Sequence, residues 1–79
     1  MPYIKEIKRK GVMMDGATSA GELNFYITTT IRQYLESKGV NYANMNEIVG
    51  VLECVKQEFY ARKMRPYEDI QIKDNGDVY

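Results

Sequence analysis

The sequence predicts a mainly α-helical (all-α) fold, an antiparallel two-helix hairpin in a single domain that spans all 79 residues. Two stretches, residues 19–38 and residues 45–64, carry apolar side chains at spacings of three and four, the period of an amphipathic helix. The connection between them is short, and short connections favour antiparallel neighbours. Outside the helices we expect a basic N-terminal arm over residues 1–17 and an acidic tail over residues 66–79.

The first helix has signals at both ends. Ser19 and Glu22 fit a capping box, in which the serine oxygen accepts a backbone amide of the first turn and the glutamate reaches back. Lys38 lies in the last turn, where the helix dipole favours a cation, and Gly39 follows as the expected C-cap. One stripe of this helix carries Leu23, Tyr26, Ile27, Thr30, Ile31, Tyr34 and Leu35.

The second helix is expected to begin after Asn44, which is a favourable N-cap residue, with Glu47 completing a looser capping box. Pro66 is expected to end the helix, because proline disfavours helical geometry in the residue before it. The apolar stripe is wider than one partner helix can cover. Its centre is Ile48, Leu52, Val55 and Phe59, and Met45, Val49 and Val51 widen it.

The two flanking segments are less regular and carry opposite charge. In the arm, Tyr3, Ile4 and Ile7 suit either a short helix or an extended segment. In the tail, residues 69–73 alternate and residues 74–77 resemble a turn, so we expect either a short tail or a mini-hairpin. Residues 1–12 hold four cations against Glu6, and residues 67–79 hold four acids against Lys73, so the two ends are expected to attract each other.

A chain of this size needs more core than it can supply, since it buries only about 60% of the surface of its unfolded form. Cys54 is the single cysteine and there is no histidine, which excludes an internal disulfide and the usual zinc sites. We therefore expect a homo-oligomer in which the second helix packs closely. The residues expected at this contact are Gly50, Leu52, Cys54, Val55 and Phe59.

Within that set, Gly50 and Cys54 each allow a more specific expectation. A glycine in mid-helix costs about 1 kcal/mol relative to alanine, and a close backbone approach would offset this cost. The approaching group is Tyr26 or Tyr34 of the same subunit, a neighbouring chain, or a ligand. Cys54 is expected to be a buried small hydrophobe rather than a reactive thiol.

The composition and motifs argue against several classes of function. Without histidine there is no usual base for a nucleophile, and Glu53 and Glu58 are not one helical turn apart, so we expect no enzyme, no cofactor and no metal. A net charge of zero disfavours DNA binding. No apolar run approaches a membrane span and no signal peptide is visible, which together with one free thiol favours the cytoplasm.

A cluster of cationic and aromatic residues near the end of the second helix is the candidate ligand site. The helix dipole alone favours cations there. Arginine also binds phosphate with a planar fork and tyrosine offers a face for a stacked base, so an anion or nucleotide site is a second interpretation. A protein interface is a third, because Tyr and Arg dominate interfaces. The cluster consists of Tyr60, Arg62, Lys63, Arg65 and Tyr67.

Short motifs follow one another through most of the chain: Gly21-Glu22-Leu23-Asn24, Asn41-Tyr42, Asn46-Glu47, Gly50, Leu52-Glu53, Glu58-Phe59-Tyr60 with Arg62, and the closing Pro66-Tyr67-Glu68-Asp69 and Asn75-Gly76-Asp77-Val78-Tyr79. Through these motifs the stretch from Gly21 to Tyr79 resembles a family of very short bacteriophage and prophage proteins without an established activity. The resemblance implies a phage-associated context and a bacterial host cell.

We expect a small non-enzymatic binding protein that acts stoichiometrically. One hypothesis is that it sequesters an anionic nucleotide messenger of host immunity, such as a cyclic nucleotide, at subunit interfaces. The alternative is a protein–protein interaction module, either an inhibitor of a host protein or a phage accessory subunit.

Overall fold

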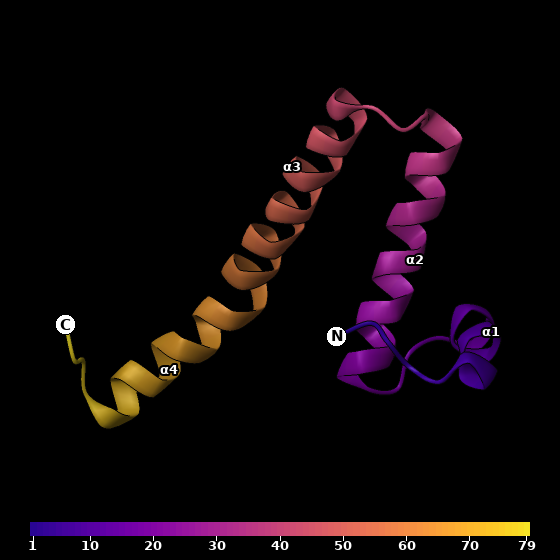
Figure 1. Ribbon diagram of the computed structural model, residues 1–79. Helices are drawn as coiled ribbons and strands as arrows, with labels where there is room; N and C mark the ends of the chain where they lie inside the picture. Colours follow the sequence, from indigo (N-terminus) through magenta and orange to yellow (C-terminus); the bar gives the residue numbers. More distant parts are fainter. The chain divides into compact units, whose positions relative to one another are not determined.

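The computed structural model covers residues 1–79 and contains helices and no strands, which confirms the all-α class (Figure 1). The chain divides into two compact units, residues 1–45 and residues 46–79. The predicted hairpin and homo-oligomer remain predictions. In chain order the elements are α1 (Glu6–Asp15), α2 (Ala20–Lys38), α3 (Tyr42–Phe59), a π-helical turn (Tyr60–Met64) and α4 (Arg65–Asn75).

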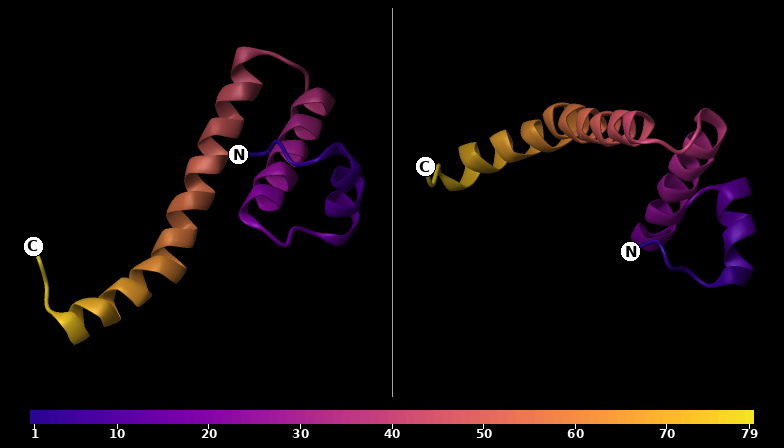
Figure 2. Two further views of the ribbon diagram at one scale, coloured as in Figure 1. Left: turned by 60° about the horizontal axis from the view of Figure 1, so that its bottom comes forward. Right: turned by 45° about the horizontal axis from the view of Figure 1, so that its top comes forward.

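The first unit is built on α1, which packs against α2. Most of the expected basic arm, residues 1–17, is therefore helical. Of the two alternatives for this arm, a short helix or an extended segment, the structure shows the helix. Val12 on α1 is the one buried side chain, at 5% exposure. The segment before α1 lies over the first turn of α2 (Figure 2), where a Cβ added at Gly21 would be 3.6 Å from the Met1 carbonyl oxygen and 3.7 Å from Ile4 Cγ2.

Arg9 joins the three parts of this unit. Its guanidinium carbon lies 5.7 Å from the centre of the Phe25 ring on α2. Its Nε donates a hydrogen bond to the Ile4 carbonyl oxygen at 3.1 Å. One cation of the basic arm therefore has an internal role in holding the N-terminal segment and α1 on α2.

The ends of α2 match the prediction for residues 19–38. Ser19 is the N-cap, and its Oγ accepts a hydrogen bond from the Glu22 backbone N–H at 3.2 Å. The Glu22 carboxylate accepts from the backbone N–H and the hydroxyl of Thr18, one residue before the expected partner. At the other end Gly39 adopts φ +114°, and its N–H donates to the Leu35 carbonyl oxygen at 2.8 Å.

The start of α3 differs from the prediction. The helix begins at Tyr42, and Asn41 is the residue whose side-chain oxygen accepts the Asn44 backbone N–H, at 2.9 Å. The prediction of Asn44 as the N-cap is therefore wrong. Its side-chain amide instead donates to the Gly39 carbonyl oxygen at 2.9 Å, and so satisfies an acceptor that the end of α2 leaves free.

Pro66 does not end the helical path, contrary to the prediction. After Phe59 the chain widens into the π-helical turn, in which the Arg65 N–H donates to the Tyr60 carbonyl oxygen five residues earlier. Pro66 then lies in the first turn of α4, where a missing N–H costs little. The wider turn also separates the proline ring from the carbonyl group of Arg62, with which it would clash in a regular α-helix.

The predicted tail or mini-hairpin is also wrong, since residues 65–75 form α4. Gly76 ends this helix at φ +91°, and its N–H donates to the Ile72 carbonyl oxygen at 2.8 Å. The Asn75-Gly76 pair is therefore a helix C-cap and not a hairpin turn. A run as short as residues 69–73 cannot by periodicity alone distinguish a strand from a helix.

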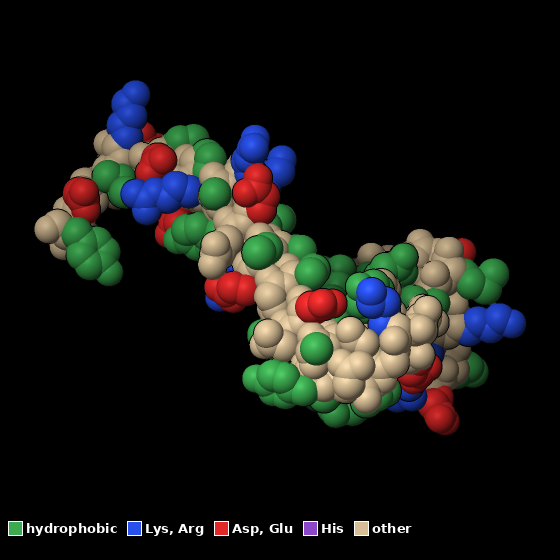
Figure 3. Space-filling model, turned by 90° about the horizontal axis from the view of Figure 1, so that it is seen from above, with side chains coloured by type: hydrophobic (Ala, Val, Ile, Leu, Met, Phe, Trp, Pro, Cys, Tyr) green, Lys and Arg blue, Asp and Glu red, His purple; other side chains and the backbone are tan.

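Large apolar side chains lie at the surface of both units (Figure 3). They are interspersed with Lys, Arg, Asp and Glu side chains in that view. No helix combines the length and the apolar character that crossing a membrane requires.

Candidate functional site

The first candidate surface is the apolar face of α3, which we call the α3 row: Ile48, Leu52, Val55 and Phe59. Their spacings of four, three and four place them on one side of a regular helix. Ile48 is half-buried, while Leu52 is 40%, Val55 60% and Phe59 61% exposed. The row is therefore a continuous strip of exposed apolar surface.

Gly50 and Cys54 do not belong to this strip. Each is two residues from Leu52, and residues two apart point to opposite sides of a helix. A Cβ added at Gly50 would have no atom within 4 Å, and Cys54 is exposed. The expected burial of Cys54 is wrong for the isolated chain, because nothing in residues 46–79 covers that face.

The second candidate is the predicted cluster around the π-helical turn. The Tyr60 hydroxyl donates a hydrogen bond to the Glu68 carboxylate, eight residues along the chain. This hydrogen bond raises the pKa of Tyr60, and desolvation and the Glu68 charge act in the same direction. Eight residues are more than two turns of a regular α-helix, so the contact depends on the extra residue in the π-helical turn.

The cations of the cluster do not converge on a common point. Arg62 Nε lies 3.2 Å from Glu58 Oε1, and Arg65 Nε lies 3.2 Å from Asp69 Oδ1. Both arginine charges are thus satisfied by carboxylates four residues away on their own helix. Lys63 forms no ion pair, and Tyr67 is 63% exposed. Of the predicted set of five, the structure leaves Lys63 as the one cation without an ion pair and Tyr67 as the more exposed of the two tyrosines, since Tyr60 is 44% exposed and its hydroxyl is bound to Glu68.

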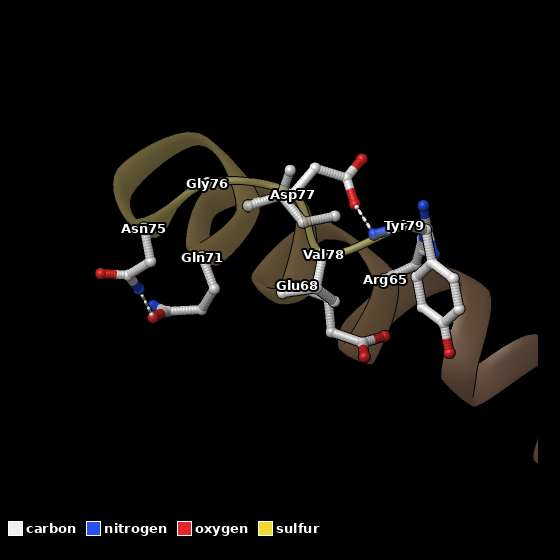
Figure 4. A pocket seen from close by; sticks show the side chains of 9 residues that line it. Arg65, Glu68, Gln71, Asn75, Gly76, Asp77, Val78 and Tyr79 are labelled. Carbon is white, nitrogen blue, oxygen red and sulfur yellow. Dashed lines mark hydrogen bonds between the residues drawn. The ribbon is translucent and has the colours of Figure 1, made fainter.

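Sequence reasoning missed a shallow pocket of about 450 Å³ along α4 (Figure 4). Arg65 belongs to its lining, but Glu68 and Asp77 also line it, so its charge does not favour an anion. The chain after α4 forms one wall, where the Tyr79 backbone N–H donates to Asp77 Oδ1 at 2.9 Å (Figure 4). The pocket depends on the helical form of residues 65–75, which the sequence pattern did not indicate.

The two carboxylates considered for acid–base chemistry, Glu53 and Glu58, each have partners three or four residues along the helical path. Glu53 accepts a hydrogen bond from Gln57 Nε2 at 3.2 Å, and its carboxylate lies 3.2 Å from Lys56 Nζ. These contacts, led by the Gln57 hydrogen bond, lower the pKa of Glu53 and so favour its ionised form. No group of three or more His, Cys, Asp or Glu residues is arranged to hold a metal ion.

A family model described as a domain of unknown function (DUF6899) matches residues 1–78. The chain belongs to this family. No curated protein and no solved structure matches the chain. The match covers the whole of the first structural unit and the second unit as far as residue 78.

Proposed function

We propose that this protein is a non-enzymatic binding protein, a protein–protein interaction module whose α3 row associates with another polypeptide and first of all with a second copy of the chain. The observation that carries the proposal is the exposed α3 row. Val12 is the one buried side chain in the molecule, while Leu52, Val55 and Phe59 are each at least 40% exposed. Complete burial of a fully exposed side chain of this kind contributes about 1.5–3 kcal/mol, and covering the part still exposed here contributes a corresponding share of that.

The resemblance to short bacteriophage proteins supports a biological setting for this activity. A small chain that binds stoichiometrically suits an inhibitor of a host protein or a phage accessory subunit in the bacterial cytoplasm.

Sedimentation velocity at micromolar concentration tests the proposal. The wild-type chain should sediment as an assembly, and Leu52→Lys should sediment as a monomer because it places a charge in the α3 row. Gln57→Lys is the matched control, since it adds the same charge at an exposed position outside the row. A wild-type chain that stays folded and monomeric at this concentration contradicts the proposal.

An anionic small molecule, such as a cyclic nucleotide sequestered at a subunit interface, is the second candidate ligand. It is supported by Lys63, whose charge is unpaired, and by Tyr67, whose ring is exposed four residues later. An unpaired cation beside an aromatic face suits a phosphate and a stacked base.

Calorimetry against a panel of cyclic oligonucleotides tests this candidate. Binding that Lys63→Glu abolishes and that Lys10→Glu leaves unchanged would support it, since Lys10 is an exposed cation of α1 that forms no ion pair. No heat from any member of the panel with folded wild-type protein would exclude those ligands.

A further inference from the structure

The geometry points to an antiparallel pairing of α3 with α3 of a second copy, which rests on the proposed self-association and specifies its orientation and register. The α3 row repeats at spacings of four, three and four, as the seam of a coiled coil does. In such a seam each apolar side chain inserts between side chains of the facing helix.

The distribution of charge along α3 and the π-helical turn selects the orientation. The part of α3 before Leu52 carries Glu47 and no cation, and Glu53 lies at the centre of the pairing, where its carboxylate is 3.2 Å from Lys56 Nζ. The later part carries Lys56 and is followed by Arg62 and Lys63, with Glu58 as the acid among them. An antiparallel pair lays the acidic end of each helix against the basic end of the other and also opposes the two helix dipoles. A parallel pair would place like ends together.

The spacing of the α3 row also sets the register. In an antiparallel seam Leu52 packs beside Val55 of the second copy, and Ile48 packs beside Phe59 of the second copy. This register has its two-fold axis between residues 53 and 54, and the same pair of contacts forms on both sides of it.

The flanks of the seam agree with this register. Val49 would face Lys56 of the second copy, and Val51 would face Glu58 of the second copy. Val49 is 65% and Val51 61% exposed in the single chain, so both have apolar surface to cover. The stems of Lys56 and Glu58 can cover this surface while their charged heads stay in water, and no like charges face each other across the seam.

The contacts of the seam end at Phe59 of each copy. The π-helical turn then interrupts the repeat, since it adds one residue to the helical path after Phe59. The seam is therefore short and self-complementary, and it joins two copies rather than a filament.

Distances between spin labels test the orientation. A label on native Cys54 lies near the two-fold axis, so its pair distance is similar in both orientations. In a Cys54→Ala background, labels at Ala61→Cys would be separated along the helices by roughly 20 Å in the antiparallel pair and by almost nothing in a parallel one. We expect the Ala61→Cys distance to be clearly longer than the Cys54 distance.

The possible outcomes separate the two proposals. No dipolar signal from Cys54 labels at a concentration where the chain is folded means that the chain does not self-associate, which overturns both. A signal from Cys54 with an equal distance at Ala61→Cys overturns the antiparallel orientation and leaves self-association standing.

Charge substitutions at Val51 provide a second readout that leaves the α3 row intact. In this register Val51 faces Glu58 of the second copy, and the contact occurs twice. Val51→Glu places like charges together and Val51→Lys places opposite charges together, each worth about 0.2–1 kcal/mol, so the dimer Kd of Val51→Glu should exceed that of Val51→Lys by roughly 5-fold. Equal Kd values for the two variants would reject this register.

Discussion

Gly50→Ala is predicted to stabilise the protein. Gly50 lies in the interior of α3, and a Cβ added there would meet no atom within 4 Å. Alanine therefore gains the helix propensity that glycine lacks without any steric cost. The difference is about 0.8–1.0 kcal/mol, because glycine loses more backbone entropy than any other residue on folding.

The size of this effect is measurable for a chain of 79 residues. A gain of about 1 kcal/mol corresponds to a rise in Tm of roughly 4–8 °C for a domain of this length. Thermal unfolding followed by circular dichroism at several protein concentrations gives the shift and separates it from changes in association.

Two other glycines serve as matched controls for Gly50→Ala. Gly11→Ala lies within α1 and also meets no atom within 4 Å, so it should stabilise by a similar amount. Gly39→Ala should destabilise by about 1–3 kcal/mol, since φ +114° is strained for any residue with a Cβ. A lower Tm for Gly50→Ala together with a raised Tm for Gly11→Ala would refute the reasoning, and would indicate that another helix approaches Gly50 closely.

Three further predictions concern the caps, the core and the π-helical turn. Ser19→Ala should lower the free energy of unfolding by about 1 kcal/mol in urea titration, because the Glu22 backbone N–H loses its acceptor; no change would contradict this capping role. Val12→Ala should cost about 1–3 kcal/mol in the same assay, as it removes buried methyl groups between α1 and α2, whereas exposed Val78→Ala should cost little. Tyr60→Phe should remove one contribution to pH dependence: the raised pKa of Tyr60 means that its hydrogen bond to Glu68 stabilises the fold below pH 10.0 and is lost as the pH rises through the folded-state pKa. Helicity measured from pH 8 to pH 12 should therefore fall more in the wild type than in Tyr60→Phe, and identical profiles would argue against a stabilising role for this hydrogen bond.

The helical class and the limits of α2 could be read from the sequence because they depend on neighbouring residues. The repeat of apolar side chains, the Ser19 cap and the Gly39 terminator each act within one or two turns. The α3 row was also predicted, since its spacing follows directly from the helical period. Gly50 and Cys54 lie on another face of α3, and their expected role in packing stays a prediction.

The errors at Asn44 and Pro66 have a common origin. Asn41 and Asn44 are both good capping residues, and the choice between them depends on where the end of α2 leaves free carbonyl groups. Pro66 is compatible with the end of one helix or the beginning of another. The π-helical turn before Pro66 depends on a backbone hydrogen bond between residues five apart, from the Arg65 N–H to the Tyr60 carbonyl oxygen. The sequence carries no periodic signal for such a bond.

The candidate ligand site shows the same division. The sequence by itself determined which residue types gather near the end of α3, and it determined the helical period that makes the α3 row. Only the structure decided that residues 65–75 are helical and that Tyr60 reaches Glu68 across the π-helical turn. The pairs Arg62–Glu58 and Arg65–Asp69 join residues four apart, so they follow once this part of the chain is known to be helical. Helical period and capping depend on residues within one or two turns, so they can be predicted from the sequence. The partner of a side chain such as that of Tyr60 depends on which groups the folded backbone brings within reach.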